Sequence, residues 1–148
     1  MIKEIDNRNN KVANQIYSIF QASYKIEAEL LQATDFPPLK RDVNEFIISN
    51  NKFYAYYLGN DLAGIIELEI NKISIHIQSL VVYPQFFRQG LGKKLVNFVF
   101  NIYNGKLFTV ETGLANQPAI NLYKSVGFKE IDQWDTDHNV RKVRFQKD

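Results

Sequence analysis

The sequence contains no cysteine among its 148 residues, and it has only two histidines. Without a thiol there is no thiolate nucleophile, no Cys-ligated zinc and no disulfide framework, and such a composition is typical of a reducing compartment. An excess of charge of one sign is also missing, because 18 basic residues face 16 acidic ones for a formal net charge of +2. Nucleic-acid-binding proteins concentrate far more positive charge on one face, so we expect no nucleic-acid partner.

Long hydrophobic runs are absent as well. No apolar stretch approaches the roughly 20 residues that a membrane-spanning helix requires. Charged Lys3, Glu4 and Asp6 stand where a signal peptide would have its apolar segment. We therefore expect a cytoplasmic protein with no membrane partner. The residues that are present, 45% hydrophobic and 23% charged, are typical of a globular protein, and the length fits one domain over 1–148.

The spacing of apolar residues changes several times along the chain. Helical spacing dominates near the N-terminus, where Pro37 and Pro38 must interrupt any helix, and it returns after Pro84. Between these parts the alternation is that of strands, with Gly59-Asn60 as a two-residue hairpin turn. The pattern predicts strands at 2–5, 52–58, 62–70, 73–82, 107–112, 128–134 and 140–146, and helices at 12–31, 43–47, 91–102 and 119–126. The order β-αα-βββ-α-β-α-ββ indicates an α+β fold, a mixed and mostly antiparallel sheet flanked by helices.

The most informative segment is the turn after the expected strand 73–82. The strand ends at Pro84, and a loop with Gly90 and Gly92 leads directly into an amphipathic helix. The first turn of a helix has unpaired amide hydrogens and a positive potential, and glycines let an anion approach that backbone closely. The segment is therefore a candidate site for phosphate or pyrophosphate, to which Arg88 and Lys93 add charge.

A plainer interpretation is that the two glycines only shape a turn, and an isolated G-x-G would favour it. The segment is neither a Walker loop nor a dinucleotide fingerprint, since no G-K-[ST] and no suitably spaced third glycine follow. A nucleotide or phosphate-ester enzyme is also disfavoured, because no metal-binding carboxylates lie near the turn.

Two linked motifs make the segment specific. The stretch V-x-P-x-x-x-R-x-G-x-G, from Val82 to Gly92, resembles motif A of the Gcn5-related N-acetyltransferase (GNAT) superfamily. Downstream, Asn116, Ala119, Leu122-Tyr123 and Gly127-Phe128 are similar to that family's N-x-x-A-x-x-L-Y-x-x-x-G-F pattern. The resemblance covers roughly residues 52–134, and the first 50 residues fit by pattern alone.

The resemblance implies a GNAT-like fold and acetyl-CoA as co-substrate, with no metal. In this family the turn amides bind the CoA pyrophosphate, and a bulge separates the fourth strand from the fifth so that the pantetheine arm pairs with the freed edge. Phe87 stands where the family usually has Gln or Arg, so we assign the anion contact to backbone amides, which do not depend on the side chain. The residues implied to bind the cofactor are Leu80, Val81, Val82, Phe87, Arg88, Gln89, Gly90, Leu91, Gly92, Lys93, Asn116 and Tyr123.

Acetyl transfer to an amine needs a base, a stabilised oxyanion and a proton for the departing thiolate. Tyr123 is the candidate acid, because the family commonly has this tyrosine near the thioester sulfur; otherwise it is an aromatic core residue. Asn116 contacts CoA, caps a helix, or does both. Glu111 is the candidate base by its resemblance to acetyltransferases of ribosomal-protein N-termini, and the alternative is a solvent-facing strand glutamate. His76 on the expected strand 73–82 is the other candidate, or a structural or exposed histidine.

Two functions remain open at this point. One is an acetyl-CoA-dependent N-acetyltransferase acting directly on a primary amine of a small molecule or of a peptide or protein N-terminus. The other is a non-catalytic acyl-CoA-binding module of the same fold. The acceptor should bind between segments 27–39 and 134–139, where Glu27, Glu29 and Asp35 either attract a cationic amine or are simply solvated. Phe36 and Trp134 form an apolar wall or fill the core. We expect His138 to be exposed in a polar loop. The sequence is also compatible with a homodimer.

Overall fold

One seven-stranded sheet organises the chain, and the computed structural model describes all of residues 1–148. Its strand order is β1-β2-β3-β4-β5-β7-β6, and every neighbouring pair is antiparallel except β4 and β5. The mixed, mostly antiparallel sheet that the sequence predicts is therefore confirmed. The strands are β1 (Ile2–Ile5), β2 (Lys52–Leu58), β3 (Asp61–Ile70), β4 (Ser74–Val82), β5 (Leu107–Gly113), β6 (Lys129–Asp135) and β7 (Arg141–Lys147).

Helices cover both faces of the sheet. They are α1 (Asn10–Leu31), α2 (Val43–Ile48), α3 (Leu91–Ile102) and α4 (Gln117–Ser125), with short 3-10 turns η1 (Pro37–Lys40) and η2 (Pro84–Phe86). The order of elements agrees with the expected one. None of these helices combines the length and the apolar character needed to cross a membrane.

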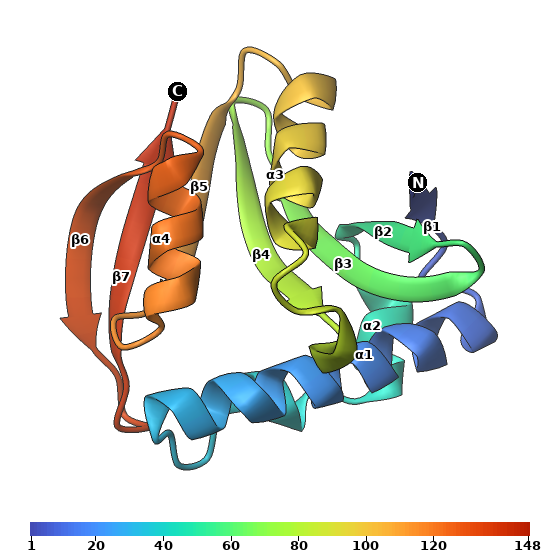
Figure 1. The fold of residues 1–148 in the computed structure, drawn as a ribbon, viewed down its shortest axis with the longest axis horizontal. Coiled ribbons are helices and arrows are strands. Elements are labelled where there is room, and N and C mark those ends of the chain that lie inside the picture. Colours follow the sequence, from blue (N-terminus) through green and yellow to red (C-terminus); the bar gives the residue numbers. More distant parts are fainter.

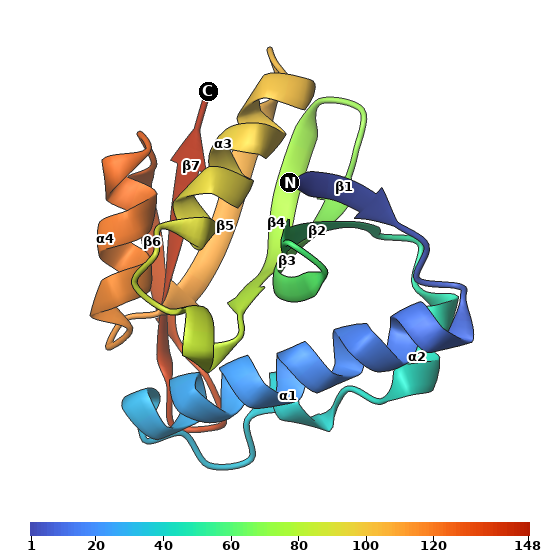
Figure 2. The same ribbon diagram turned by 45° about the vertical axis from the view of Figure 1, so that its right-hand side comes forward.

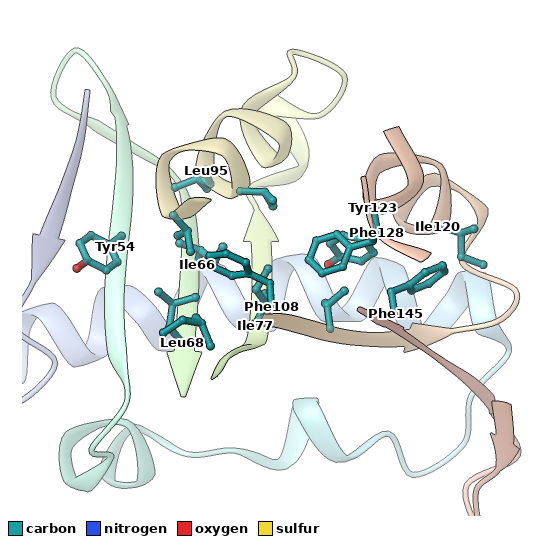
Figure 3. Packing of buried hydrophobic residues seen from close by; sticks show 14 of the residues in the cluster. Tyr54, Ile66, Leu68, Ile77, Leu95, Phe108, Ile120, Tyr123, Phe128 and Phe145 are labelled. Carbon is teal, nitrogen blue, oxygen red and sulfur yellow. The ribbon is translucent and has the colours of Figure 1, made fainter. Parts of the chain in front are cut away.

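Two hydrophobic cores follow from the alternation of side chains along the strands. On one face, α3 and α4 pack on a cluster that includes Ile66, Phe108, Tyr123 and Phe145, and Figure 3 shows these residues gathered between the sheet and the two helices. On the other face, α1 and α2 pack on a second cluster around Phe20, which includes Ile65 and Val81. Neighbouring strand residues such as Ile65 and Ile66 thus belong to different cores.

One part of the predicted stripe on the first helix does not enter either core. Ile26 and Leu30 have 42% and 47% of their surface exposed, whereas Leu31 is buried. The physical reason is that the last turns of α1 extend past the second core and form the wall of a cavity, which Ile26, Leu30 and Leu31 all line. Helical spacing alone does not distinguish a cavity wall from a core.

β4 and β5 separate along their length. They pair only from Ser74↔Leu107 to Ile77↔Val110 and then diverge. Figure 1 shows the two strands side by side at one end and apart at the other, where α1 crosses the opening; Figure 2 shows the same crossing from another side. This opening between two parallel strands positions the candidate site.

Candidate active site between the diverging strands

A bulge in β4 marks the point at which the strands part. β3 and β4 change register between Glu67↔Ser79 and Leu68↔Ile77, so that Gln78 has no partner in β3. The last paired position of β4 and β5 is Ile77↔Val110, the residue before this bulge. An extra residue bends its strand and increases the local twist. The bulge that the family resemblance implies is therefore present. No glycine or proline at this position indicates it in the sequence.

A cavity of about 990 Å³ occupies the opening, and we call it the central cavity. Its walls come from β4, β5, the start of α3, α4 and the last turns of α1, and from the loop between β6 and β7, which we call the C-terminal loop. Ligand sites of small molecules and cofactors commonly have volumes of roughly 300–1,000 Å³. The central cavity is thus large enough for an extended ligand that passes between two faces of the sheet.

The glycine turn forms one end of the central cavity. Gly90 is the N-cap of α3 with φ 75°, and no side chain caps this helix. Arg88 also has a positive φ of 65°, a conformation that is uncommon for residues other than glycine. Because a helix start leaves its first amides without intrahelical partners, those of Leu91, Gly92 and Lys93 are available to an anion in the cavity.

Gly92 also has a packing role that the anion argument does not require. A Cβ at this position would lie 3.0 Å from Cδ1 of Leu122 and 3.6 Å from Cδ2 of Leu80. The missing side chain thus allows α3 to lie close to α4 and β4 at the cavity.

Most of the residues predicted to bind the cofactor meet at the central cavity, and two do not. Val81 is buried in the core beneath α1, as the alternation of β4 requires. Gln89 is exposed on the turn and does not line the cavity. The ten that line it are Leu80, Val82, Phe87, Arg88, Gly90, Leu91, Gly92, Lys93, Asn116 and Tyr123.

Tyr123 packs in the core and also lines the central cavity. Its ring packs in the core, with centroids 5.6 Å from Phe128 and 6.1 Å from Phe145. Its hydroxyl makes no hydrogen bond to the protein, and since no enclosed polar side-chain atom lacks a partner, this hydroxyl reaches the open space of the cavity. Burial raises the pKa of Tyr123, and the Glu27 carboxylate raises this pKa further, so the hydroxyl stays protonated.

Asn116 caps α4 and also contacts α1. Its side-chain oxygen accepts a hydrogen bond from the Ala119 amide at 3.2 Å, which confirms the predicted N-cap. Its side-chain nitrogen donates to Glu27 Oε1 at 2.6 Å. Burial raises the pKa of the Glu27 carboxyl, while the hydrogen bond from Asn116 and the charge of Lys142 partly oppose this rise. A half-buried carboxyl therefore lies in the cavity wall opposite α4.

Glu111 lines the central cavity from β5 and is ion-paired there. Its Oε2 accepts a hydrogen bond from Arg144 Nη1 at 2.7 Å, and Lys142 Nζ lies 3.9 Å from its Oε1. Arg144 is its cross-strand partner on β7. Both carboxylate oxygens thus face cations.

His76 lies outside the lining of the central cavity. Its Nδ1 is 2.7 Å from the hydroxyl oxygen of Thr109 on β5, within the paired part of the two strands. Burial lowers the pKa of His76, and the Glu111 carboxylate opposes this effect. The ring is therefore neutral near pH 7 and is bonded across the strands, away from the opening.

A buried ion pair that the sequence did not indicate lies beside the central cavity, which Arg41 and Asn51 line. Glu67 is fully buried, and both of its oxygens accept hydrogen bonds from Arg41, at 2.7 and 2.6 Å. Asn51 donates to the same carboxylate at 2.8 Å, and the guanidinium lies 4.3 Å from the ring centroid of Phe46. Arg41 and Glu67 are 26 positions apart, so no local pattern predicts this network.

One residue of the C-terminal loop, His138, is less exposed than we expected. The side chain of His138 is 10% exposed, because its ring packs edge-on against Phe36 at 6.0 Å. The expectation that His138 is exposed is therefore wrong. Phe36 is buried next to Leu31 and Val140, and it lines the cavity together with His138, whereas Trp134 does not.

Two proteins with related sequences match different shares of this chain. The UPF0157 protein YqkA of Bacillus subtilis is 29% identical over 133 residues, which are 89% of this chain and 39% of that protein. An N-alpha-acetyltransferase of Sulfurisphaera tokodaii is 38% identical over 60 residues, which are 38% of this chain and 36% of that protein. The chain thus spans well under half the length of these two relatives.

Solved structures share the fold over the whole chain. The ribosomal-protein-S18-alanine N-acetyltransferase of Escherichia coli matches with a TM-score of 0.76 at 18% identity, over 99% of this chain and 91% of that chain. YncA of Salmonella typhimurium, described as a putative acetyltransferase with its cofactor acetyl-CoA, matches with a TM-score of 0.72 at 15% identity, over 99% and 92%.

The sequence itself also matches a known protein family. The acetyltransferase (GNAT) family matches residues 13–128, which include the glycine turn, both strands of the opening and the helix of Asn116 and Tyr123. The match extends over well more than half of the 148 residues and agrees with the shared fold, and the chain accordingly belongs to the acetyltransferase (GNAT) family.

Proposed function

We propose that residues 1–148 form a single N-acetyltransferase domain that transfers an acetyl group from acetyl-CoA directly to a primary amine. One observation carries this proposal. The central cavity runs from the uncapped start of α3, through the opening at the Gln78 bulge, to the Tyr123 hydroxyl and the carboxylates of the opposite wall. The central cavity thus contains an anion site, a channel for an extended arm and groups that can transfer protons.

The donor end uses the backbone. The amides of Leu91, Gly92 and Lys93 would hold the pyrophosphate of CoA, and the cations of Arg88 and Lys93 add to the potential at the helix start. The edge of β4 over Leu80–Val82 is not paired with β5, so its free polar groups can bond an extended pantetheine arm as a strand would.

The chemistry follows from placing the thioester near Tyr123. Its protonated hydroxyl would donate a proton to the sulfur as the thiolate departs. The amine attacks the carbonyl carbon directly, so no acyl-enzyme is required. Glu111 on the opposite wall is the base that the family resemblance implies, and the acceptor is a small-molecule amine or a peptide N-terminus. The expected cytoplasmic location, the lack of a metal, nucleic-acid or membrane partner, and a homodimer stay predictions.

The proposal is tested by measuring thiol release from acetyl-CoA with a panel of amines, alongside the affinity for CoA. We expect turnover with at least one amine. Tight CoA binding without thiol release across the panel would instead indicate a non-catalytic acyl-CoA-binding module.

Tyr123→Phe keeps the aromatic packing and removes the hydroxyl. We expect kcat to fall by about 10²-fold because the thiolate loses its proton donor, with the Kd for CoA unchanged. Tyr17→Phe is the matched control, since the Tyr17 hydroxyl also makes no hydrogen bond but the residue lies outside the cavity. Equal rates of Tyr123→Phe and the unmodified protein over the whole pH range would exclude Tyr123 as the acid.

A further inference from the structure

We propose that Glu27, on α1, receives the ammonium group of the acceptor and takes its proton, so that the base of the reaction comes from α1 and not from β5. This inference rests on the proposed N-acetyltransferase function and assigns the acceptor subsite of the same cavity. It also defines the acceptor class, a primary amine that enters as a cation.

The geometry leaves one oxygen of Glu27 free. Oε1 accepts the hydrogen bond from Asn116 Nδ2 at 2.6 Å, and Oε2 has no hydrogen-bond partner in the protein. Both residues line the central cavity, as does Tyr123 on the helix that Asn116 caps. Asn116 therefore acts as a positioning residue that holds the carboxylate of Glu27 toward the same space as the Tyr123 hydroxyl.

The charges around Glu27 are few. The titratable groups that act on it are Lys142 on β7, Tyr24 on its own helix and Tyr123 on α4. Lys142 Nζ also lies 3.9 Å from Glu111 Oε1. Burial raises the pKa of the Glu27 carboxyl more than Asn116 and Lys142 lower it. A carboxyl whose pKa is raised toward neutrality is better matched to proton abstraction near pH 7 than an ordinary one.

Glu111 offers the contrast within the same cavity. Its two oxygens already face Arg144 at 2.7 Å and Lys142 at 3.9 Å. A carboxylate that two cations already neutralise gains little from a third, whereas Glu27 has one neutral amide as its hydrogen-bond partner. The incoming ammonium group is consequently drawn to Glu27, and Glu111 mainly joins β5 to β7.

The proposed transfer conserves protons and electron pairs. Glu27 Oε2 takes a proton from R–NH₃⁺, and the freed lone pair forms the C–N bond while the carbonyl π pair moves to oxygen. Collapse of this oxyanion breaks the C–S bond, and the thiolate takes the Tyr123 proton. The second nitrogen proton of the intermediate restores Tyr123, and the proton on Glu27 passes to solvent. The products are the amide, CoA thiol and one released proton.

The test compares Glu27→Gln, Glu111→Gln and Glu29→Gln by thiol release with lysine, spermidine, kanamycin and a hexapeptide that has a free N-terminal alanine. In E27Q the new amide keeps an oxygen that accepts from Asn116, but the basic carboxylate is gone. We expect kcat/KM of E27Q to fall by about 10²-fold, and the acidic limb of its pH profile to disappear. Glu29 is exposed on the same helix and, unlike Glu27, does not line the central cavity, so E29Q should match the unmodified protein.

Three other results would contradict the assignment of Glu27 as the base. An E27Q protein that retains its rate and its acidic limb, or an E111Q protein that loses that limb in its place, would overturn the role of Glu27 alone. Loss of CoA binding or of folding in E27Q would show a structural role and would also overturn it. No thiol release by the unmodified protein with any of the four amines would overturn this inference and the proposed function together.

Discussion

The two halves of the central cavity are built in different ways. The half that we propose for the donor, residues 80–93, presents helix-start amides and an open strand edge, so its features belong to the backbone. The acceptor half, formed by α1, the segment 36–51 and the loop before β7, presents side chains that distant segments hold in place. Examples are Arg41 on Glu67 and Asn116 on Glu27.

Because of this difference, members of one family can keep the same anion site while their acceptor walls differ. Backbone amides bind an anion whatever the side chain is, so the proposed donor site does not depend on Phe87, which stands where the family usually has Gln or Arg. Side-chain networks depend on each member, and a change in any of them alters the wall that the acceptor meets. Three variants test this contrast.

Arg41→Ala should destabilise the fold most. It would leave the fully buried Glu67 carboxylate with Asn51 alone, and removing one partner of a buried ion pair costs about 3 kcal/mol. Urea unfolding measures this loss, and the affinity of the folded variant for CoA should not change. Lys40→Ala, at an exposed ion pair with Asp35, is the control with an expected loss under about 1 kcal/mol. Similar losses for the two variants would contradict the acceptor-half network.

Gly92→Val should weaken CoA binding by about tenfold. The added Cβ would lie 3.0 Å from Leu122 Cδ1, and overpacking at such a contact costs on the order of 1–3 kcal/mol. Gly105→Ala is the matched control at the other end of α3, because its φ of 86° strains an alanine but nothing lies within 4 Å. Calorimetric titration with CoA distinguishes them: G105A should lose stability and keep its affinity. Unchanged affinity in G92V would show that the close approach of α3 is not needed for the donor site.

Arg88→Ala should have the smallest effect. Arg88 is exposed, and an exposed charge near an anion contributes at most about 1 kcal/mol, which salt screens. We expect the Kd for CoA to rise by about threefold at low ionic strength, with the difference vanishing at high ionic strength. A salt-independent loss of more than about tenfold would move the anion contact from the amides to the guanidinium.

The fold could be predicted because its signals are local. Apolar spacing, the Gly59-Asn60 hairpin turn and the cap at Asn116 each act within a few residues, and the turn residue Gly127 adopts φ 102° directly after α4. The donor half belongs to the same category, since a strand, a glycine turn and a helix follow one another in sequence. These features require no knowledge of distant contacts.

The segments of the acceptor half could be predicted, since Glu27 and Phe36 do line the cavity, but its side-chain contacts could not, for the opposite reason. Glu27 looks like a solvated helix residue, and only its position opposite Asn116, 89 residues later, gives it a buried partner. The Gln78 bulge has no local sequence signal either, and only the family resemblance implied it, because it arises from the pairing of β4 with β3 and not from the preference of one residue. Ile26 and Leu30 continue an apolar stripe that leads into a cavity instead of a core.

Asn116 has a consequence for how this protein can change over evolutionary time. One amide accepts from the Ala119 backbone and donates to Glu27, so position 116 must supply an acceptor and a donor in two directions at once. Aspartate would cap the helix but repel the carboxylate, and serine would cap it without reaching α1. Positions 27 and 116 should therefore covary among homologous sequences, with asparagine retained wherever position 27 is acidic.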